Sequence, residues 1–599
     1  MTEKPYEYLY SLRNNIFNQS VEVRKMQMQA AELGFKGFLK MWKDYQKMKL
    51  LSGGFKIDNA TCFTGQPLEL LSGDYVCTDE CITFFNKLGI ECIVCPHPIM
   101  PIERLVNIDT GEERLKIAYK KGYVWRTAIV EKSVIASSNS ILQLAAKGVV
   151  VNSENAKALS TYLLDIEQRN YEEIPETLSV SRLGWVESGF APYVEGLTFD
   201  GEDNFKRIFN SVSTAGDFDK WVDFMRKVRK EGITARLVLA ASFASVLIDP
   251  CGLLPFFLHL WGTTEQGKTV SLLLAASVWA NPQMGEYITT FNSTAVGQEM
   301  TASFLNSLPM CIDELQIKSS EGVKDFDKMI YQLTEGIGKT RGTKTGGLQK
   351  QNTWKNCFIT SGEQPITNPH SNGGAVNRII EVEYQELLYH NLVELADFVK
   401  QNYGHAGKAF VEYLQQDGVL DEVRQIQKGY YKQLLNTDST DKQAASMSAI
   451  LTADKFATDL FFKDDLNLTV NDVSSIMAKK KDVDANRRAH EYALSLIETH
   501  AFNFIRKDGE VKGEIWGCIE YGEVYILKTI FDREMSAAGY NSTAFLSWAK
   551  RNGKIRCDSD GRNTKKKRIS EISGKDQPRC VCFVTDSTFE PIDDDDLPI

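Results

Sequence analysis

The chain lacks the marks of an exported or membrane-spanning protein. Its first residues, Met1 to Leu12, are polar and acidic, without the basic start and apolar stretch of a secretory signal. The most apolar stretch, Leu237 to Ile248, is interrupted at Asp249-Pro250, which leaves it too short to cross a bilayer. No internal repeat is evident. We therefore expect a cytoplasmic protein that has no membrane partner.

An excess of basic charge is also absent. The net charge is -10 over 599 residues, so any contact with nucleic acid must come from local basic segments. Twelve cysteines in a chain without an export signal favour reduced thiols over a disulfide framework. With 43% hydrophobic residues the chain can fill several packed cores, and global disorder is not expected.

Apolar runs and turn signals divide the chain into six predicted segments. They are a helical lead-in of one or two helices (1–54), an N-terminal α+β domain (55–210), a central domain around a glycine-rich loop (211–395), a helical region and linker (396–510), a winged-helix-like domain (511–590) and an acidic tail (591–599). The predicted fold class is α/β.

The glycine-rich loop has the spacing of a phosphate-binding loop. It consists of Gly262, Thr263, Thr264, Glu265, Gln266, Gly267, Lys268 and Thr269, between a strand-like run and a helical one. Glycines let the backbone wind tightly, so that N–H groups and a helix N-terminus point at one polyphosphate. Lys268 would offset the phosphate charge and Thr269 would help to hold Mg²⁺. These residues predict binding of ATP with Mg²⁺.

A second apolar run ends in two acids, Asp313 and Glu314, which is a Walker B pattern. Asp313 would hold the hydrated Mg²⁺ and Glu314 would orient the attacking water. A third strand ends in Thr360 and Ser361, either of which could sense the terminal phosphate. Arg378, at the start of a further strand, is a candidate arginine finger that acts on a neighbouring subunit, although a surface salt bridge would also explain it.

A basic glycine-rich segment separates the acids from the third strand. Residues 336 to 356 include five basic residues and no acidic one. The candidates for contact with a DNA backbone are Lys339, Arg341, Lys344 and Lys350. A solvated basic loop is the alternative.

Taken in order, GTTEQGKT, PMCIDE, the basic hairpin, ITSGE and GGAVNRIIEV resemble a compact superfamily 3-type AAA+ helicase. More narrowly, the chain resembles the phage and mobile-element ATPases of the domain of unknown function 927 type, over roughly residues 60 to 385. The resemblance implies a P-loop AAA+ core and a ring-forming, ATP-driven helicase or replication initiator with an accessory DNA-binding domain. The sensor position departs from the asparagine of many relatives.

The C-terminal segment predicts a winged helix. Two helices, 531 to 539 and 542 to 552, precede a hairpin-like segment, and residues 550 to 579 have eleven basic and four acidic residues. The predicted wing contacts are Arg562, Lys565, Lys566, Lys567 and Arg568. A small basic protein-interaction domain is the alternative.

Four N-terminal cysteines, Cys77, Cys81, Cys92 and Cys95, could in principle bind zinc, although Cys92 lies in a run that predicts a buried strand. The sequence as a whole predicts an ATP hydrolase that unwinds DNA. It would act as a homo-oligomer, expected to be a hexamer, on single-stranded and duplex DNA, possible partners being the primase or polymerase of a phage or other mobile element. The alternatives are an ATP-controlled origin-binding initiator or DNA-sensing switch, and an AAA+ remodeller that binds no DNA.

Overall fold

The computed structural model describes residues 4–52, 59–86, 88–315, 319–342, 348, 351–367, 371, 373–506, 513–569 and 577–584. The chain divides into two compact units. The first comprises Met1–Val106 and Glu112–Thr177, and the second comprises Asn107–Gly111 and Leu178–Ile599. Of the helices that the structure describes, none has the length and apolar character needed to span a membrane.

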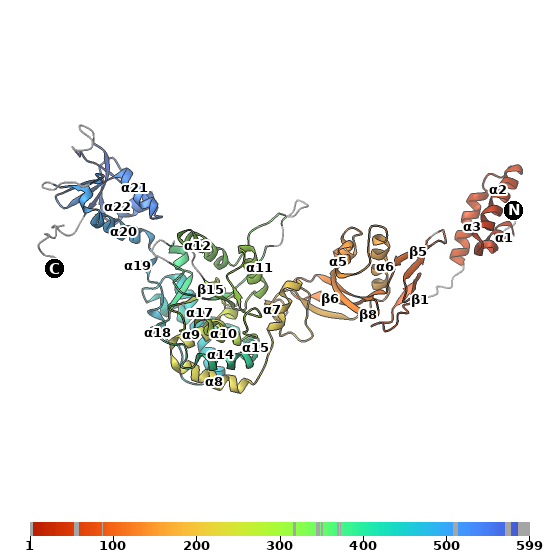
Figure 1. The fold of residues 1–599 in the computed structure, drawn as a ribbon, viewed down its shortest axis with the longest axis horizontal. Coiled ribbons are helices and arrows are strands. Elements are labelled where there is room, and N and C mark those ends of the chain that lie inside the picture. The colour runs from red at the N-terminus through yellow and green to blue at the C-terminus, as the bar shows by residue number, and fades with distance from the viewer. Residues whose placement is uncertain are drawn as a thin grey trace. The chain divides into compact units, whose positions relative to one another are not determined.

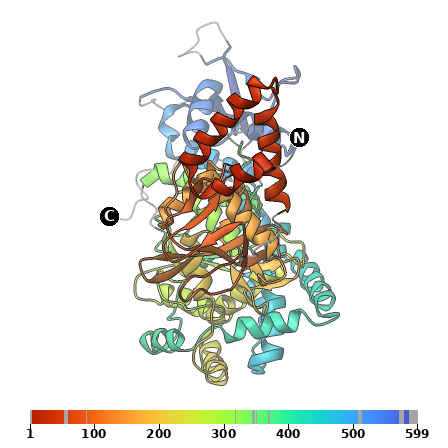
Figure 2. The ribbon, with the colours of Figure 1, turned by 90° about the vertical axis from the view of Figure 1, so that its right-hand side faces the viewer.

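The first unit begins with three helices, one more than the sequence predicted. They are α1 (Lys4–Ser11), α2 (Ile16–Glu32) and α3 (Phe38–Ser52). Figures 1 and 2 show these red helices packed side by side. Their contact is aromatic, because the ring of Tyr6 stacks on those of Phe38, Trp42 and Tyr45.

The rest of the first unit is an α+β fold with a core of its own. Its strands are β1 (Asn59–Ala60), β2 (Leu71–Gly73), β3 (Tyr75–Cys77), β4 (Ile82–Phe85), β5 (Glu91–Cys95), β6 (Ile99–Asn107), β7 (Glu113–Lys121) and β8 (Val124–Glu131), and its helices are α4 (Lys132–Ile135), α5 (Leu144–Lys147) and α6 (Ala156–Arg169). Strands β6, β7 and β8 form an antiparallel meander. The long helix α6 packs its apolar side into this core.

A parallel sheet organises the second unit. Its strands, in spatial order, are β14 (Thr289–Thr290), β15 (Met310–Leu315), β16 (Cys357–Gly362), β13 (Phe256–Trp261) and β17 (Ile379–Glu383). All neighbouring pairs are parallel, so their carboxyl ends meet at one edge. Ligands of open α/β sheets bind outside that edge.

Helices surround this sheet and share its core. They are α7 (Lys206–Ser211), α8 (Phe218–Glu231), α9 (Ile233–Ala244), α10 (Lys268–Ser277), α11 (Ala295–Leu305), α12 (Ser319–Glu335), α13 (Gly373–Val376), α14 (Leu392–Gln401), α15 (His405–Leu414), α16 (Val419–Leu435), α17 (Asp441–Ala457), α18 (Val470–Ser474) and α19 (Lys480–Val483). Short strands β9 (Glu176–Val180), β10 (Gly184–Val186), β11 (Gly189–Ala191) and β12 (Thr198–Phe199) precede them.

Two predicted domain boundaries, after residue 210 and before residue 396, differ from the division that the packed cores show. Residues 178 to 210 fall in the second unit rather than with the N-terminal α+β domain, since Leu183 and Phe190 belong to its core. The helices between 396 and 477 are not a separate region either. Helix α17 packs on α9 and is buried on nearly every side, as a helix in a protein interior must be.

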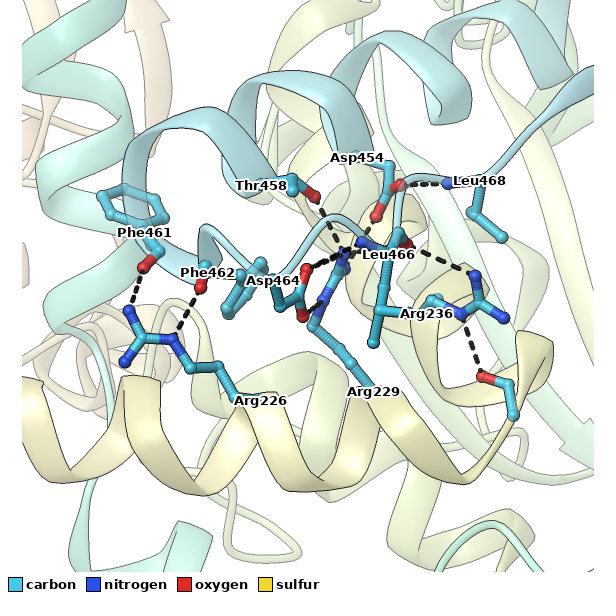
Figure 3. Close-up of polar contacts among 11 residues, drawn as sticks. Arg226, Arg229, Arg236, Asp454, Thr458, Phe461, Phe462, Asp464, Leu466 and Leu468 are labelled. Carbon is cyan, nitrogen blue, oxygen red and sulfur yellow. Dashed lines mark hydrogen bonds and ion pairs between the residues drawn. The ribbon is translucent and has the colours of Figure 1, made fainter.

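A buried arginine network joins α8 to the end of α17 and the segment that follows it (Figure 3). Arg229, at the end of α8, is 1% exposed. Its guanidinium donates to Asp454 and Asp464 at 2.8 Å each and to Thr458 Oγ1 at 2.8 Å. It also lies over the Phe462 ring. Because every nitrogen has an acceptor, the buried charge is compensated and fixes α8 against the segment that follows α17.

The C-terminal part has a third core. It contains α20 (Ala485–Thr499), α21 (Lys528–Ala537), α22 (Ser542–Arg551), β18 (Phe504–Ile505), β19 (Gly517–Glu520), β20 (Glu523–Leu527), β21 (Ile555–Arg556), β22 (Lys565–Lys566) and β23 (Arg579–Val584). The order in the sheet is β18-β19-β20-β23-β21, with β22 also paired to β23. Helix α20 belongs to this core, so the segment begins earlier than the predicted residue 511.

Candidate nucleotide-binding site

The loop 262–269 connects the carboxyl end of β13 to the first turn of α10. Gly267 caps the helix with φ +99°, and a Cβ there would come within 2.7 Å of Leu392 Cδ2. A Cβ on Gly262 would come within 2.7 Å of Gln266 Oε1. Glycine is required at both positions because the backbone winds through conformations and spaces that a side chain would obstruct.

Three polar side chains converge beside this loop. Thr269 Oγ1 donates to Asp313 Oδ1 at 3.4 Å, and Ser361 Oγ donates to the same oxygen. Lys268 Nζ donates to the carbonyl oxygens of Gly262, at 2.8 Å, and Thr263. Together with Glu265 and Glu363 these residues line a cavity of about 400 Å³. Residues 44 positions or more apart in sequence thus meet at the carboxyl edge of the sheet.

The charges in this cavity are mixed. Burial lowers the pKa of Lys268, while the carboxylates of Glu363 and Asp313 act in the opposite direction. Among the described residues, Lys268 donates hydrogen bonds only to carbonyl oxygens of its own loop, which are weak acceptors compared with a phosphate. The cradle of glycines, a lysine and a hydroxyl-carboxylate pair therefore fits a polyphosphate that arrives with a divalent cation.

The two sensor candidates, Thr360 and Ser361, differ in whether their side chains reach the cavity. Ser361 lines the cavity and bonds Asp313, whereas Thr360 is fully buried. Thr360 Oγ1 lies 2.9 Å from His259 Nδ1 on the neighbouring strand. Adjacent residues of a strand point to opposite faces, so only one of this pair can face the cavity. The structure does not place Thr360 there.

A polar row under the sheet fixes the turn that follows β16. His259 Nε2 lies 2.9 Å from the carbonyl oxygen of Gln364 and must donate to it, so Nδ1 accepts from Thr360. Burial lowers the pKa of His259 to about 4, which keeps the ring neutral. Glu381, which lies on β17 beside His259, accepts from the backbone N–H groups of Ile366 and Thr367 at 2.6 and 2.9 Å.

Glu363 occupies the start of this fixed turn and lines the cavity. The sequence prediction did not include it, although it directly follows the strand that was singled out. Its place one residue beyond the strand end was the available signal. Glu314 lies on β15, but its side chain is outside the described residues.

Arg378 lies at the opposite edge of the sheet. Its carbonyl oxygen accepts from Phe257 N at the amino end of β13, and its guanidinium lies 4.6 Å from the ring centre of Tyr331. By the pairing of β17 with β13 it neighbours Phe256, six residues before Gly262. At about 3.3 Å per residue this is roughly 20 Å from the loop. Arg378 therefore does not contribute to the site of its own chain.

The basic segment forms a hairpin where it is described. Gly338 N donates to Asn352 O at 2.8 Å, and isolated bridges pair Ile337 with Thr353 and Gly342 with Leu348. Lys339 is exposed. Arg341, however, bonds the carboxylate of Glu299 on α11 at 2.7 Å, and that carboxylate is fully buried. Arg341 is half-buried and is thus paired with an internal carboxylate rather than unpaired on the surface. Lys344 and Lys350 lie outside the described residues.

The predicted wing residues differ in exposure. Arg562, Lys566 and Arg568 are exposed. Lys565 bonds Glu523 at 3.4 Å and Lys567 bonds Glu520 at 2.5 Å, so these two ammonium groups already have carboxylate partners within the sheet.

The zinc prediction is not supported. Among the described residues no group of three or more His, Cys, Asp or Glu side chains could hold a metal ion, and all four cysteines are described. Cys77 lies against Tyr162 Oη and Cys95 against the Val150 carbonyl. Burial raises the pKa of Cys77 to about 11 and that of Cys95 to about 12, which favours the thiol over the thiolate that zinc needs.

Two family models match the chain. Residues 86–354 match the domain of unknown function DUF927, and residues 484–588 match the Cch helix turn helix domain. The first match confirms the narrower resemblance that the motifs indicated. The second places a helix-turn-helix domain in the part of the chain where the sequence predicted a winged helix. The match begins one residue before α20 and includes α21 and α22.

A solved structure, "SCCmec type IV Cch - active helicase", has the same overall fold. It matches with a TM-score of 0.60 at 17% identity, over 86% of this chain and 98% of the other. At this identity the likeness shows the fold alone. The search of curated proteins found no match. This chain thus combines a mixed α/β fold and a parallel sheet with a match to a helix-turn-helix domain, and its fold is similar to that of the helicase.

Proposed function

We propose that this chain is an ATP-dependent DNA helicase of a phage or other mobile genetic element, built on a P-loop AAA+ core of the superfamily 3 type. The observation that carries the proposal is the single cavity in which Lys268, Thr269, Asp313 and Ser361 meet beside the glycine loop. The likeness to a protein described as an active helicase, and the match to the Cch helix turn helix domain, support it.

The residues divide the work of phosphoryl transfer. The N–H groups of the loop and the N-terminus of α10 bind the phosphates, and Lys268 leaves its carbonyl contacts to bind the β- and γ-phosphates. Thr269 and Asp313 would hold Mg²⁺, which would neutralise charge on the phosphates. Ser361 fixes Asp313 and reports on the γ-phosphate. Glu314, at the end of β15, orients the attacking water.

Contact with DNA is divided between the two basic segments. The exposed Lys339 near the hairpin base and the exposed Arg562, Lys566 and Arg568 of the C-terminal domain are the proposed phosphate ligands. The hairpin would follow a single strand as the nucleotide state changes, and the helix-turn-helix domain would bind duplex. Homo-oligomerisation, with a hexameric ring as the proposed form, would bring Arg378 of one copy to the cavity of the next.

The test is a pair of variants in the cavity. Lys268→Ala and Asp313→Asn should each lower ATP turnover by about 100-fold or more, since each removes charge stabilisation that acts on the reacting phosphate. Unwinding of forked DNA should disappear with turnover. Strand separation by Lys268→Ala at a substantial fraction of the wild-type rate would refute the proposal.

The C-terminal domain favours one alternative, an origin-binding initiator or DNA-sensing switch that uses ATP to assemble without processive unwinding. Both candidates bind duplex and hydrolyse ATP. They differ in the strand-displacement assay, where the switch releases no strand from a forked substrate at any ATP concentration.

A further inference from the structure

The turn between β7 and β8 presents a tyrosine that its own fold does not use. The strands pair as far as Lys121 and Val124, so the turn has two residues, Gly122 and Tyr123. Backbone φ is +62° at Gly122 and is not positive at Tyr123, which is the pattern of a type II′ turn. This turn requires glycine first but no aromatic residue second. Tyr123 is nevertheless 98% exposed.

Two cations accompany the tyrosine. Lys121 and Arg126 are exposed and lie on one face of the hairpin, because Lys121 pairs with Val124 and Arg126 follows two positions later. Such diagonal neighbours are about 7–8 Å apart. Within the described part of the chain neither forms an ion pair. The nearby carboxylate of Asp79 is already bound by Lys120 at 2.8 Å.

The hairpin beneath this tip is anchored. Trp125 Nε1 donates to the Thr64 carbonyl at 3.2 Å, and its ring meets the edge of Phe63 at 6.0 Å between ring centres. Tyr119 Oη donates to the carbonyl oxygen of Lys147 at 2.5 Å. From Arg114 to Arg126 the hairpin contains five basic residues and no acidic one. An anchored stem therefore carries an exposed aromatic ring at its tip and, on one face below it, two cations without ion-pair partners among the described residues.

We propose that the tip of the β7–β8 hairpin binds single-stranded DNA, with the ring of Tyr123 stacked on a base and with Lys121 and Arg126 on phosphates. Stacking on an aromatic ring beside a basic track is the general mode of sequence-independent single-strand binding. The inference rests on the proposed function, and it adds a DNA contact in the first unit, apart from the two basic segments of the second.

The test measures the affinity of the full-length protein for a fluorescein-labelled oligothymidylate of about 20 nucleotides by anisotropy. Tyr123→Ser should weaken binding about 5- to 100-fold, whereas Tyr123→Phe should keep it, because stacking needs the ring and not the hydroxyl. The double variant Lys121→Gln/Arg126→Gln should reduce the slope of log K against log salt by about 1.4, or 0.7 for each single-strand phosphate contact.

The chain provides a matched control. Tyr521 is 100% exposed in another two-residue turn, between β19 and β20, but Glu520 and Glu523 flank it. Tyr521→Ser should leave the affinity unchanged, because the residues that flank its turn are carboxylates already held in ion pairs by Lys565 and Lys567, and neither can bind a phosphate.

Three outcomes would overturn the inference. Wild-type affinity in Tyr123→Ser would do so and leave the proposed function intact. If Tyr123→Ser bound oligothymidylate like wild type but its sedimentation coefficient differed from that of wild type, the tip would be a contact between copies of the chain. A wild-type protein that binds no oligothymidylate would remove both the inference and the proposed function.

Discussion

Replacing Arg341 by glutamine distinguishes two roles for the base of the basic hairpin. The sequence predicts a DNA ligand, whereas the structure pairs Arg341 with Glu299, a carboxylate that is fully buried. Gln332 of α12 donates to the other oxygen of the same carboxylate. Breaking a buried ion pair by removing one partner costs about 3–5 kcal/mol. Because Arg341 is itself 36% exposed, we expect about half of that, roughly 2 kcal/mol, from Arg341→Gln.

The assay is a double-mutant cycle in urea, followed by circular dichroism. Glu299→Gln removes the stranded charge, so Arg341→Gln/Glu299→Gln should be more stable than Arg341→Gln, with a coupling of about 1–2 kcal/mol. DNA affinity and its salt slope are measured on the same proteins. The opposite result would be wild-type stability in Arg341→Gln together with a loss of about 0.7 from the slope of log K against log salt for single-stranded DNA. If Glu299→Gln then restored neither quantity, Arg341 would be a DNA ligand and our interpretation would fail.

Three further predictions concern buried polar groups. Arg229→Met should lower the free energy of unfolding by about 3–5 kcal/mol, and adding Asp454→Asn should recover part of it; a urea midpoint equal to wild type would contradict this. The pKa of His259 is about 4 in the folded protein and 6.5 in the unfolded chain, so acid protonates the unfolded chain first. The contribution of the neutral ring to the free energy of unfolding is therefore complete above pH 6.5 and is lost as the pH falls towards 4. That loss, about 3 kcal/mol in wild type, should be missing in His259→Gln when stabilities at pH 7 and 4 are compared. Ser361→Ala should lower kcat about tenfold, for the loss of one hydrogen bond to a charged group, while Thr360→Ser should keep it; equal kcat values in the two variants would refute the assignment.

The sequence predicted four of the five strands of the parallel sheet, β13, β15, β16 and β17, because each is a short apolar run next to a recognisable polar signal, and it did not predict the two-residue strand β14. The loop at Gly262, the acid at Asp313 and the hydroxyl at Ser361 each follow such a run, and parallel pairing brings their carboxyl ends together. The partner of Arg341 could not be predicted in this way. Glu299 is 42 residues away and looks like an ordinary helical glutamate until α11 is packed.

The boundary errors have a similar cause. Helix α17 is rich in alanine and serine, so it has no strong apolar stripe, and its sequence does not show which core it enters. Only packing on α9 reveals that it belongs with the sheet. Likewise the four cysteines are close in sequence, but their strands direct Cys77 and Cys95 into the core, where the thiol is the stable form.

The position of Arg378 leads to a test of assembly that does not require a structure of the oligomer. One chain places its loop at the carboxyl edge of the sheet and Arg378 at the amino edge, roughly 20 Å apart by the rise of a strand, so a site that uses both must draw on two copies. Asp313→Asn and Arg378→Ala should each be inactive alone. In an equal mixture about one quarter of the contacts between copies would join an intact cavity to an intact arginine, and ATP turnover should return to about that fraction. A mixture as inactive as its components would exclude Arg378 from the neighbouring site. Within one chain Arg378 is too far from the loop to act there, so recovery can come only from contacts between copies.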